Sequence, residues 1–252
     1  MTSRPPHKHS PGPWTRLYVT SDLAEGSTHD CDAAQTNYLA SVLRLDVGAE
    51  LLLFNGRDGE WCAAIAEAGR RWLRLTVGNR IRPQATGPDL HYLFAPLKRS
   101  RLDYMVQKAT ELGVCRLQPV LTRRTQAERV NLDRMRANAV EAAEQCGILR
   151  IPEVLETGKL EPVLASWSPQ RRLIFCDEAA DIVSPLEALG RVSPGPLAVL
   201  IGPEGGFTVE ERDGLKRLPY VTTISLGPRI MRADTAAVAA LALVNAVLGD
   251  WR

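Results

Sequence analysis

The pattern of apolar and polar residues changes partway along the chain, and it predicts two kinds of structure. Up to about residue 88, the apolar residues form short β-type runs separated by turn signals such as Asn-Gly and Asp-Gly. We expect one short helix and four strands here, at residues 39–45 and at 16–19, 50–55, 60–65 and 72–77. Several short strands joined by tight turns are typical of a small β-barrel.

From residue 89 onward, strand patterns alternate with helix patterns. The expected strands are residues 91–97, 114–121, 172–176, 197–201 and 221–226. The expected helices begin at capping residues, namely Ser100, Asn131, Thr208 with Glu211, and Asp234 or Thr235. Such alternation predicts an α/β domain with a mainly parallel sheet that helices cover on both faces.

Breaks in composition suggest where the domains begin and end. Residues 1–13 contain four prolines and almost no apolar residues, so we expect a flexible tail there. The segment 82–88 has Pro and Gly near its ends and is interpreted as a linker. It would separate a barrel domain, residues 14–88, from an α/β domain, residues 89–252.

Charge and cysteine content narrow the class of protein. The formal net charge of +2 neither requires nor excludes a nucleic-acid partner. The five cysteines are widely spaced and include no C-x-x-C pair, so we expect reduced thiols, no disulfide framework and no metal site. The longest apolar stretch, residues 236–248, is too short to cross a bilayer, and no secretory signal is expected. These features favour a cytoplasmic protein without a membrane partner.

Ligands of open parallel sheets bind outside the carboxyl ends of the strands, and two strand ends here are unusual. Ile201 is followed by Gly-Pro-Glu-Gly-Gly, and Leu226 by Gly-Pro-Arg-Ile-Met-Arg. The first loop lacks both Gly-Lys-Ser/Thr and G-x-G-x-x-G, which argues against an NTP-binding enzyme. It is either a tight turn into a capped helix or a backbone that approaches a ligand closely. Arg229 and Arg232 of the second loop either pair with Glu204 or bind an anionic ligand.

Two further features leave alternatives open. Basic clusters follow two of the expected strands, Lys98, Arg99 and Arg101 after the first and Arg123-Arg124 after the second. Such clusters are either solvated surface or contacts to the phosphates of a nucleic acid. The final helix is apolar almost all round, which fits either a subunit interface or burial within one subunit.

At the two loops the sequence resembles a known family. Residues 200–207, Leu-Ile-Gly-Pro-Glu-Gly-Gly-Phe, and residues 226–236, Leu-Gly-Pro-Arg-Ile-Met-Arg-Ala-Asp-Thr-Ala, resemble the signature loops of the RsmE family of SPOUT-class methyltransferases. Residues 106–113, 141–147 and 38–45 are also typical of that family. Five motifs in the family's order, over nearly the whole chain after the tail, make the resemblance specific.

The resemblance implies a fold and an activity. The fold is a SPOUT methyltransferase domain with a parallel sheet and a C-terminal trefoil knot, preceded by a small PUA-like β-barrel that binds RNA. The activity is S-adenosylmethionine-dependent methylation of N3 of a uridine in the decoding region near the 3′ end of bacterial 16S rRNA. The substrate would be the 30S ribosomal subunit, and the enzyme would act as a homodimer.

The resemblance also implies roles for particular residues. The expected cofactor contacts are Leu200, Ile201, Gly202, Gly205, Leu226, Gly227, Arg229, Ile230 and Met231. The expected RNA contacts are Arg16, Arg44, Lys98, Arg99, Arg101, Arg123 and Arg124. Two positions depart from the family pattern: Asp234 replaces the usual Glu, and Ile148-Leu149 precede Arg150, where the family commonly has Arg soon after Gln-Cys-Gly.

Methylation at N3 requires removal of a proton whose pKa lies well above neutrality. We expect Arg232 to stabilise charge on the uracil oxygens, with Glu204 or Asp234 as the base. The alternative is that Glu204 and Arg232 only tie the two loops together. Two other functions stay open, a SPOUT enzyme that methylates ribose 2′-O and a non-catalytic RNA-binding ribosome-assembly factor.

Overall fold

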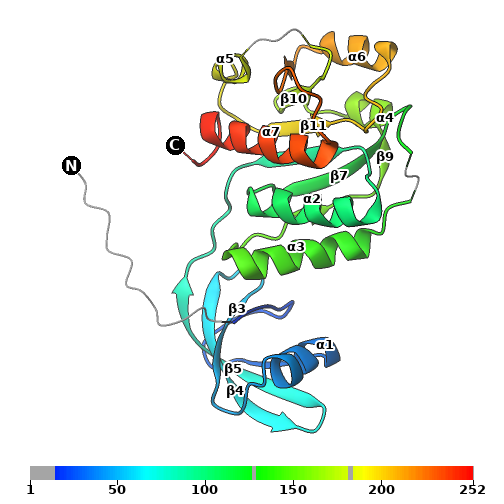
Figure 1. Ribbon diagram of the computed structural model, residues 1–252. Coiled ribbons are helices and arrows are strands. Elements are labelled where there is room, and N and C mark those ends of the chain that lie inside the picture. The colour runs from blue at the N-terminus through cyan, green and yellow to red at the C-terminus, as the bar shows by residue number, and fades with distance from the viewer. Residues whose placement is uncertain (1–14, 127–128, 181–183, 252) are drawn as a thin grey trace, which may run out of the picture. The chain divides into compact units, whose positions relative to one another are not determined.

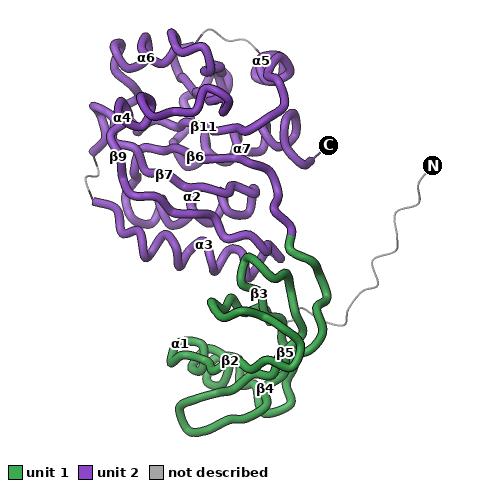
Figure 2. Tube along the Cα trace, turned by 180° about the vertical axis from the view of Figure 1, so that it is seen from behind, with its two compact units in different colours: residues 1–84 green, residues 85–252 purple. Residues whose placement is uncertain are grey.

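The chain divides between Gln84 and Ala85, within the segment that we interpreted as a linker. The computed structural model describes residues 15–126, 129–180 and 184–251, and Figure 2 shows the two units in different colours. Unit 1 takes in the chain up to residue 84, and unit 2 takes in the remainder. The expected tail, residues 1–13, lies outside the described residues.

Unit 1 is built on a five-stranded sheet in the order β1-β3-β4-β5-β2. The strands are β1 Arg16–Tyr18, β2 Thr28–Asp30, β3 Glu50–Phe54, β4 Glu60–Gly69 and β5 Trp72–Arg82. Strands β3, β4 and β5 are antiparallel neighbours, whereas β1 runs parallel to β3. Alternate apolar residues face one core, in which Leu51, Leu53, Ile65 and Leu75 are fully buried. The four predicted strands are confirmed. Strand β2 was missed because its three residues carry no apolar pattern.

The helix expected at residues 39–45 begins earlier and has a different form. It consists of α1, Ala33–Thr36, followed directly by a π-helical segment η1, Asn37–Val42. A capping box of Asp32 and Gln35 starts α1, because each side chain bonds the backbone N–H of the other residue. Just after η1, Arg44 has a φ of 56°, a left-handed conformation that is uncommon outside glycine.

Unit 2 contains a seven-stranded sheet in the order β12-β10-β11-β6-β7-β8, with β9 paired to β7. The strands are β6 Leu90–Phe94, β7 Arg116–Leu121, β8 Glu153–Val154, β9 Gly158–Lys159, β10 Arg172–Cys176, β11 Leu197–Ile201 and β12 Val221–Ile224. All the pairings are parallel, as predicted. Every residue of β6 and β11 is buried, because helices cover both faces of the sheet.

Two apolar cores lie on the opposite faces of this sheet. Helices α2 Arg99–Glu111, α3 Leu132–Cys146, α5 Pro185–Gly190 and α7 Ala233–Val247 cover one face. Helices α4 Leu160–Ala165 and α6 Val209–Lys216 cover the other. Figure 1 shows α7, α2 and α3 side by side across the sheet. The described chain contains no helix that is long and apolar enough to cross a membrane.

The helix starts are partly as predicted. Asn131 caps α3 by accepting from the Arg134 N–H at 2.9 Å, and Thr208 with Glu211 forms the expected capping box of α6. The other two expectations are wrong. Helix α2 begins at Arg99, before Ser100, and α7 begins at Ala233, so that Asp234 lies in its first turn. In both cases the side chain of the residue before the helix makes no capping hydrogen bond. The preference for Ser, Thr, Asp and Asn at helix starts therefore could not locate the first residue of these helices.

Candidate active site

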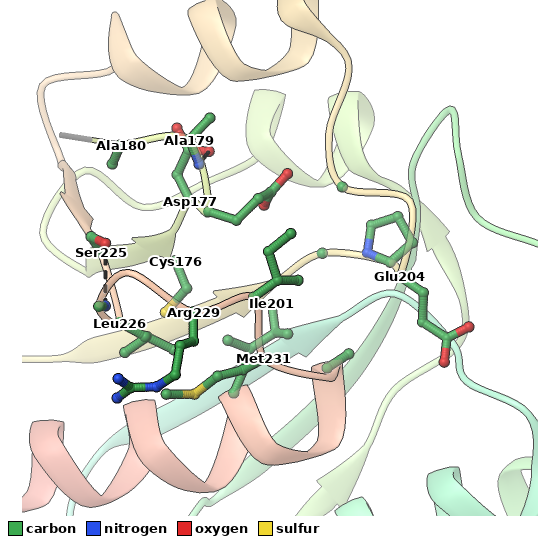
Figure 3. A pocket seen from close by; sticks show the side chains of 18 of the residues that line it. Cys176, Asp177, Ala179, Ala180, Ile201, Glu204, Ser225, Leu226, Arg229 and Met231 are labelled. Carbon is green, nitrogen blue, oxygen red and sulfur yellow. Dashed lines mark hydrogen bonds between the residues drawn. The ribbon is translucent and has the colours of Figure 1, made fainter. Parts of the chain in front are cut away.

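A cavity lies at the carboxyl ends of three neighbouring strands, β12, β10 and β11. Its volume is about 520 Å³, which is within the usual range for small-molecule sites. Its walls are residues 176–180, 201–206 and 225–231, together with Ala233 and Ala236 at the start of α7. Both loops that the sequence singled out therefore line one cavity, and Figure 3 shows them facing each other.

Two glycines shape the loop after β11, and a side chain at either position would force a neighbouring side chain to move. A side chain at Gly202 would collide with the ring of Phe207, which is 1% exposed. Gly206 has a φ of 66°, and a side chain there would collide with the carboxylate of Glu178. The Gly206 N–H also donates to the Pro203 carbonyl at 2.9 Å. The loop is thus a tight turn into helix α6 and, at the same time, a wall of the cavity.

The loop after β12 combines half-buried apolar side chains with exposed apolar and charged ones. Leu226 and Met231 are half-buried against the cavity, as Figure 3 shows. Ile230 is 90% exposed, which is unusual for a large apolar side chain. Arg229 and Arg232 are also exposed, and neither has an ion-pair or hydrogen-bond partner among residues 15–126, 129–180 and 184–251. They are consequently available to a ligand or substrate.

Glu204 does not pair with either of these arginines. Its carboxylate, 46% exposed, points away from the cavity and forms an ion pair with Arg101 of α2. The guanidinium of Arg124 donates to the Gly205 carbonyl at 2.8 Å. The alternative in which Glu204 and Arg232 tie the two loops together is therefore wrong. Two residues expected to bind RNA, Arg101 and Arg124, contact the loop after β11.

The loop after β10 forms a third wall that the sequence analysis did not identify. Asp177 is fully buried and is bound by Arg212 at 2.9 Å and by Lys216 at 3.0 Å, both from α6. Its Oδ1 also accepts from the Ala179 N–H at 3.1 Å. Arg212 reaches the neighbouring Glu178 at 3.2 Å. The available signal was an Asp-Glu pair directly after a buried strand, at the same edge of the sheet as the two glycine-containing loops.

Two further groups at the cavity have defined environments. Burial raises the pKa of Cys176 to about 12, so that thiol stays protonated and is not a nucleophile at neutral pH. Asp234 lies in the first turn of α7 between Ala233 and Ala236, both of which line the cavity. One of its oxygens accepts from the Thr235 N–H at 2.9 Å. Of the two expected catalytic carboxylates, Glu204 and Asp234, it is therefore Asp234 that lies on a cavity-lining turn and has no ion-pair partner among the described residues.

The remaining residues expected to bind RNA divide into exposed and buried ones. Lys98, Arg99 and Arg123 are exposed at the start of α2 and after β7. Arg44 is exposed in unit 1. Arg16 is different, because its side chain is 9% exposed, pairs with Glu60 at 2.6 Å and covers the Phe54 ring. Its contacts stabilise unit 1 and leave little surface for RNA.

A second polar cluster lies at the amino ends of the strands, on the side of the sheet opposite the cavity. Potential metal-ligating atoms of Asp89, His91 and Cys115 lie within 4.8 Å of one another. Arg171, however, donates to both Asp89 carboxylate oxygens at 2.9 Å and to the Leu197 carbonyl at 3.0 Å. Burial, with the nearby Arg171, lowers the pKa of His91 to about 4. This cluster is an ion-paired network closed by an arginine.

The fold and the site together define a class of protein. A parallel sheet covered by helices, with a cavity at adjoining strand ends and flexible-backbone glycines in its wall, is the arrangement of an α/β enzyme that binds an organic cofactor. The cavity offers backbone groups and apolar side chains for binding, together with Arg229, which has no partner among the described residues.

Comparisons with known proteins identify the family. Residues 85–245 match the model of an RNA methyltransferase domain, and residues 32–78 match that of an RNA methyltransferase PUA domain. A ribosomal RNA small subunit methyltransferase E from Rickettsia conorii is 32% identical over 234 residues, or 92% of this chain and 95% of the relative. The chain therefore belongs to the RNA methyltransferase family, and the resemblance to RsmE proteins is confirmed.

Solved structures share the fold. A putative methyltransferase from Legionella pneumophila, in complex with bound S-adenosylmethionine, has a TM-score of 0.82 and 27% identity, with 94% of this chain and 99% of that chain covered. A ribosomal RNA small subunit methyltransferase E from Neisseria gonorrhoeae, also bound to S-adenosylmethionine, has a TM-score of 0.84 and covers 95% of this chain and 100% of that one. At 24% identity, the second likeness is evidence for the fold.

Proposed function

We propose that the protein transfers a methyl group from S-adenosylmethionine to N3 of a uridine in the decoding region near the 3′ end of 16S rRNA. The observation that carries this proposal is the cavity at the ends of β10, β11 and β12. It lies in a chain that aligns over 92% of its length with small-subunit ribosomal RNA methyltransferase E of Rickettsia conorii. The substrate is the 30S subunit or its RNA.

The cavity fits S-adenosylmethionine in size and chemistry. Its volume of about 520 Å³ suits a nucleoside with a short amino-acid arm. Ile201, Leu226 and Met231 offer apolar surface to an adenine ring, and the glycine backbone at 202 and 205–206 permits close approach. We assign cofactor contacts to the backbone and apolar groups of residues 200–205 and 226–231, which would lie within the trefoil knot expected of a SPOUT fold.

The chemistry that the cofactor supplies is an electrophilic methyl group on a sulfonium centre. The protein's residues must then hold uracil N3 in line with that methyl group and accept the proton that N3 carries. Asp234 is the better candidate for the base, since Glu204 points away from the cavity and is paired with Arg101. General-base catalysis of this kind contributes roughly 10² to 10⁴ in rate. Arg232, which has no partner among the described residues, would stabilise negative charge that develops on the uracil oxygens.

A base-paired uridine cannot present N3, so the target must be unpaired or flipped out of its helix. We propose that the exposed Lys98, Arg99 and Arg123, with Arg44 of unit 1, contact the rRNA backbone. Arg101 and Arg124 have a second role, because they hold the loop that carries Glu204 and Gly205. A phosphate that binds these two arginines would therefore act on the cofactor loop as well.

We further propose that the protein is a homodimer. Helix α7 keeps apolar side chains on its partly exposed positions, among them Val238, Leu243 and Val247. A second copy of the chain, packed on this face, would bury them. Sedimentation equilibrium with a Leu243→Glu variant tests this, because a charge at such an interface should shift the protein to monomers. Since the substrate is a ribosomal subunit, we propose a cytoplasmic location.

The test of the proposed function is methyl transfer from labelled S-adenosylmethionine. The substrates are 30S subunits and free 16S rRNA from cells that lack their own N3-uridine methyltransferase, followed by mass spectrometry of the nucleosides. We expect 3-methyluridine, and the preferred substrate then gives the assembly stage. A 2′-O-methylated nucleoside would contradict N3 as the target. Cofactor binding without transfer to either substrate would support a non-catalytic assembly factor instead.

A further inference from the structure

We propose that Glu178 is a further cofactor-binding residue, whose carboxylate accepts hydrogen bonds from the ribose hydroxyls of S-adenosylmethionine. The proposal rests on the proposed function and deepens it. Glu178 belongs to the loop after β10, which forms the cavity wall opposite Leu226 and Met231. None of the expected site residues came from this loop.

The cavity is lined by three carboxylates within the described part of the chain, and they differ in whether an oxygen remains available to accept a hydrogen bond from a ligand. Asp177 is paired with Arg212 and Lys216 and accepts from a backbone N–H, and its Oδ2, which makes no hydrogen bond among the described residues, is buried away from the cavity surface. Glu204 points away from the cavity and is paired with Arg101. Glu178 is 43% exposed, and only its Oε1 has a partner among the residues that the structure describes. Its Oε2 is therefore an available acceptor.

The carboxylate of Glu178 is held in place before any ligand arrives. Arg212 donates to Glu178 Oε1 at 3.2 Å and is itself fixed by Asp177 at 2.9 Å. On the other side, the carboxylate lies against the backbone at Gly206, where a side chain would collide with it. The loops after β10 and β11 thus meet at this group. A pre-organised acceptor loses less conformational entropy on binding than a free glutamate side chain would.

The charge balance indicates which group of the ligand this acceptor would bind. An ionised carboxylate accepts hydrogen bonds and donates none, so it requires a donor. S-adenosylmethionine has two kinds of strong donor away from its base, the ribose hydroxyls and the α-ammonium group. Arg212 already supplies a cation to Glu178, which favours neutral hydroxyl donors over a second cation. A carboxylate at a strand end is also a recurrent partner of nucleoside ribose hydroxyls.

The test combines one substitution with altered ligands, and the readout is the dissociation constant from isothermal titration calorimetry. The ligands are S-adenosylhomocysteine, its 2′,3′-dideoxy analogue, and 5′-methylthioadenosine, which keeps the ribose and lacks the amino-acid arm. For Glu178→Ala we expect a 10- to 100-fold weaker affinity for S-adenosylhomocysteine and methylthioadenosine, as charged hydrogen bonds of about 1.5 to 3 kcal/mol imply. For the dideoxy analogue, wild type and variant should agree within about twofold.

Controls separate a local effect from loss of folding. Glu187→Ala removes an exposed glutamate on α5 that pairs with Arg191 outside the cavity, and it should bind like wild type. Glu178→Gln keeps the size of the side chain and should lose less affinity than the alanine variant. Melting curves without ligand should show that each variant is folded.

Three results would overturn the proposal in distinguishable ways. If Glu178→Ala binds S-adenosylhomocysteine as wild type does, Glu178 is not a cofactor contact, while the proposed function stands. If the loss persists with the dideoxy analogue and vanishes with methylthioadenosine, the carboxylate binds the ammonium group instead. If wild-type protein binds none of the three ligands, the proposed function itself fails.

Discussion

The two edges of the seven-stranded sheet carry similar residue types but use them differently. At the amino ends of the strands, Arg171 is bound to both carboxylate oxygens of Asp89, and Arg116 pairs with Glu153. At the carboxyl ends, Arg229 and Arg232 have no ion-pair or hydrogen-bond partner among the described residues. A charge that finds its partner within the fold contributes to stability, whereas an unpaired one at a cavity rim is free for a ligand.

The backbone at the carboxyl ends of the strands is also suited to contact with a ligand. At the carboxyl edge, Gly202, Gly206 and Gly227 lie in cavity walls, and the last two have positive φ angles. Such loops let main-chain groups approach a ligand, at a cost in conformational entropy on folding. We therefore expect substitution of Arg229 or Arg232, which are exposed and have no partner among the described residues, to change activity more than stability. Substitution of the ion-paired Arg171 at the amino edge should change stability more than activity.

The largest expected effect is the loss of catalysis in Arg232→Ala. Removal of a donor that stabilises charge in the transition state should lower kcat by about 10²- to 10³-fold. The melting temperature should stay close to that of wild type, because the side chain is exposed and unpaired among the described residues. Single-turnover methyl transfer and thermal melting measure the two effects. Arg217→Ala, which removes an exposed arginine directly after α6, is the matched control. Normal turnover of Arg232→Ala would remove this residue from the mechanism.

A methyl group added at Gly202 should affect both properties, since this glycine joins the cavity to the core. The new Cβ would collide with the buried ring of Phe207. Overpacking of this kind costs about 1 to 3 kcal/mol of unfolding free energy. We also expect at least tenfold weaker binding of S-adenosylhomocysteine, because the displaced loop forms the cavity wall. Urea denaturation and calorimetry measure the two effects.

Gly214→Ala provides the control for this glycine. Gly214 lies inside α6, and a Cβ there would meet no atom within 4 Å. Alanine should therefore stabilise the protein by about 0.5 to 1 kcal/mol through helix propensity, without changing affinity. Equal effects of the two substitutions would show that the Phe207 contact does not constrain the loop.

The cavity glycines are also among the features of the site that could be predicted from the sequence alone. Strands β6 and β11 of unit 2 were predictable because each is apolar on both faces, and segments with a helix period of 3.6 lie between the strands of this unit. The loops after β11 and β12 were predictable as site walls, since glycine and arginine at strand ends are unusual for connectors. Their mutual position required only that neighbouring parallel strands end at the same edge.

The elements that were missed depend on long-range contacts or on short segments. Strands β8 and β9 have two residues each, and α4 and α5 have six, too few to establish a period. The role of Asp177 depends on Arg212 and Lys216, which lie more than thirty residues away in the sequence. Likewise, no local pattern shows that Glu204 pairs with Arg101, since the two are separated by 103 positions.

At the amino edge, Arg171→Ala should reduce stability and leave function intact. The guanidinium donates to two backbone carbonyls and to both oxygens of Asp89. Because that carboxylate is 49% exposed and can be solvated again, we expect a loss of about 1 to 2 kcal/mol. Affinity for S-adenosylhomocysteine should change less than twofold. The matched control is Arg191→Ala, which breaks an exposed i,i+4 pair with Glu187 and should cost about 0.5 kcal/mol or less. A large drop in methyl transfer would contradict the separation of the two edges.

The smallest expected effect is a pH dependence of stability that arises from His91. Burial and the positive charges of Arg171 and Arg116 lower its pKa from 6.5 to about 4, despite the nearby carboxylate of Asp89. The unfolded chain therefore binds a proton first as the pH falls. The stability due to neutral His91 is fully present above about pH 6.5 and is lost towards pH 4, by at most ~1.4 kcal/mol per pH unit. Asp89 does not contribute in this window, because Arg171 holds the pKa of its carboxyl below the usual value of 3.8.

Urea denaturation between pH 7 and pH 4.5 tests this expectation in the wild type and in His91→Asn. The variant has no titrating group at this position, so its unfolding free energy should fall less steeply with acid, whatever its stability at pH 7. Methyl transfer, corrected for the folded fraction, should show no matching difference between the two proteins, since His91 lies at the edge of the sheet opposite the cavity. Parallel stability curves would mean that the buried imidazole gains a proton without cost, and that the amino-edge network is looser than its ion pairs indicate.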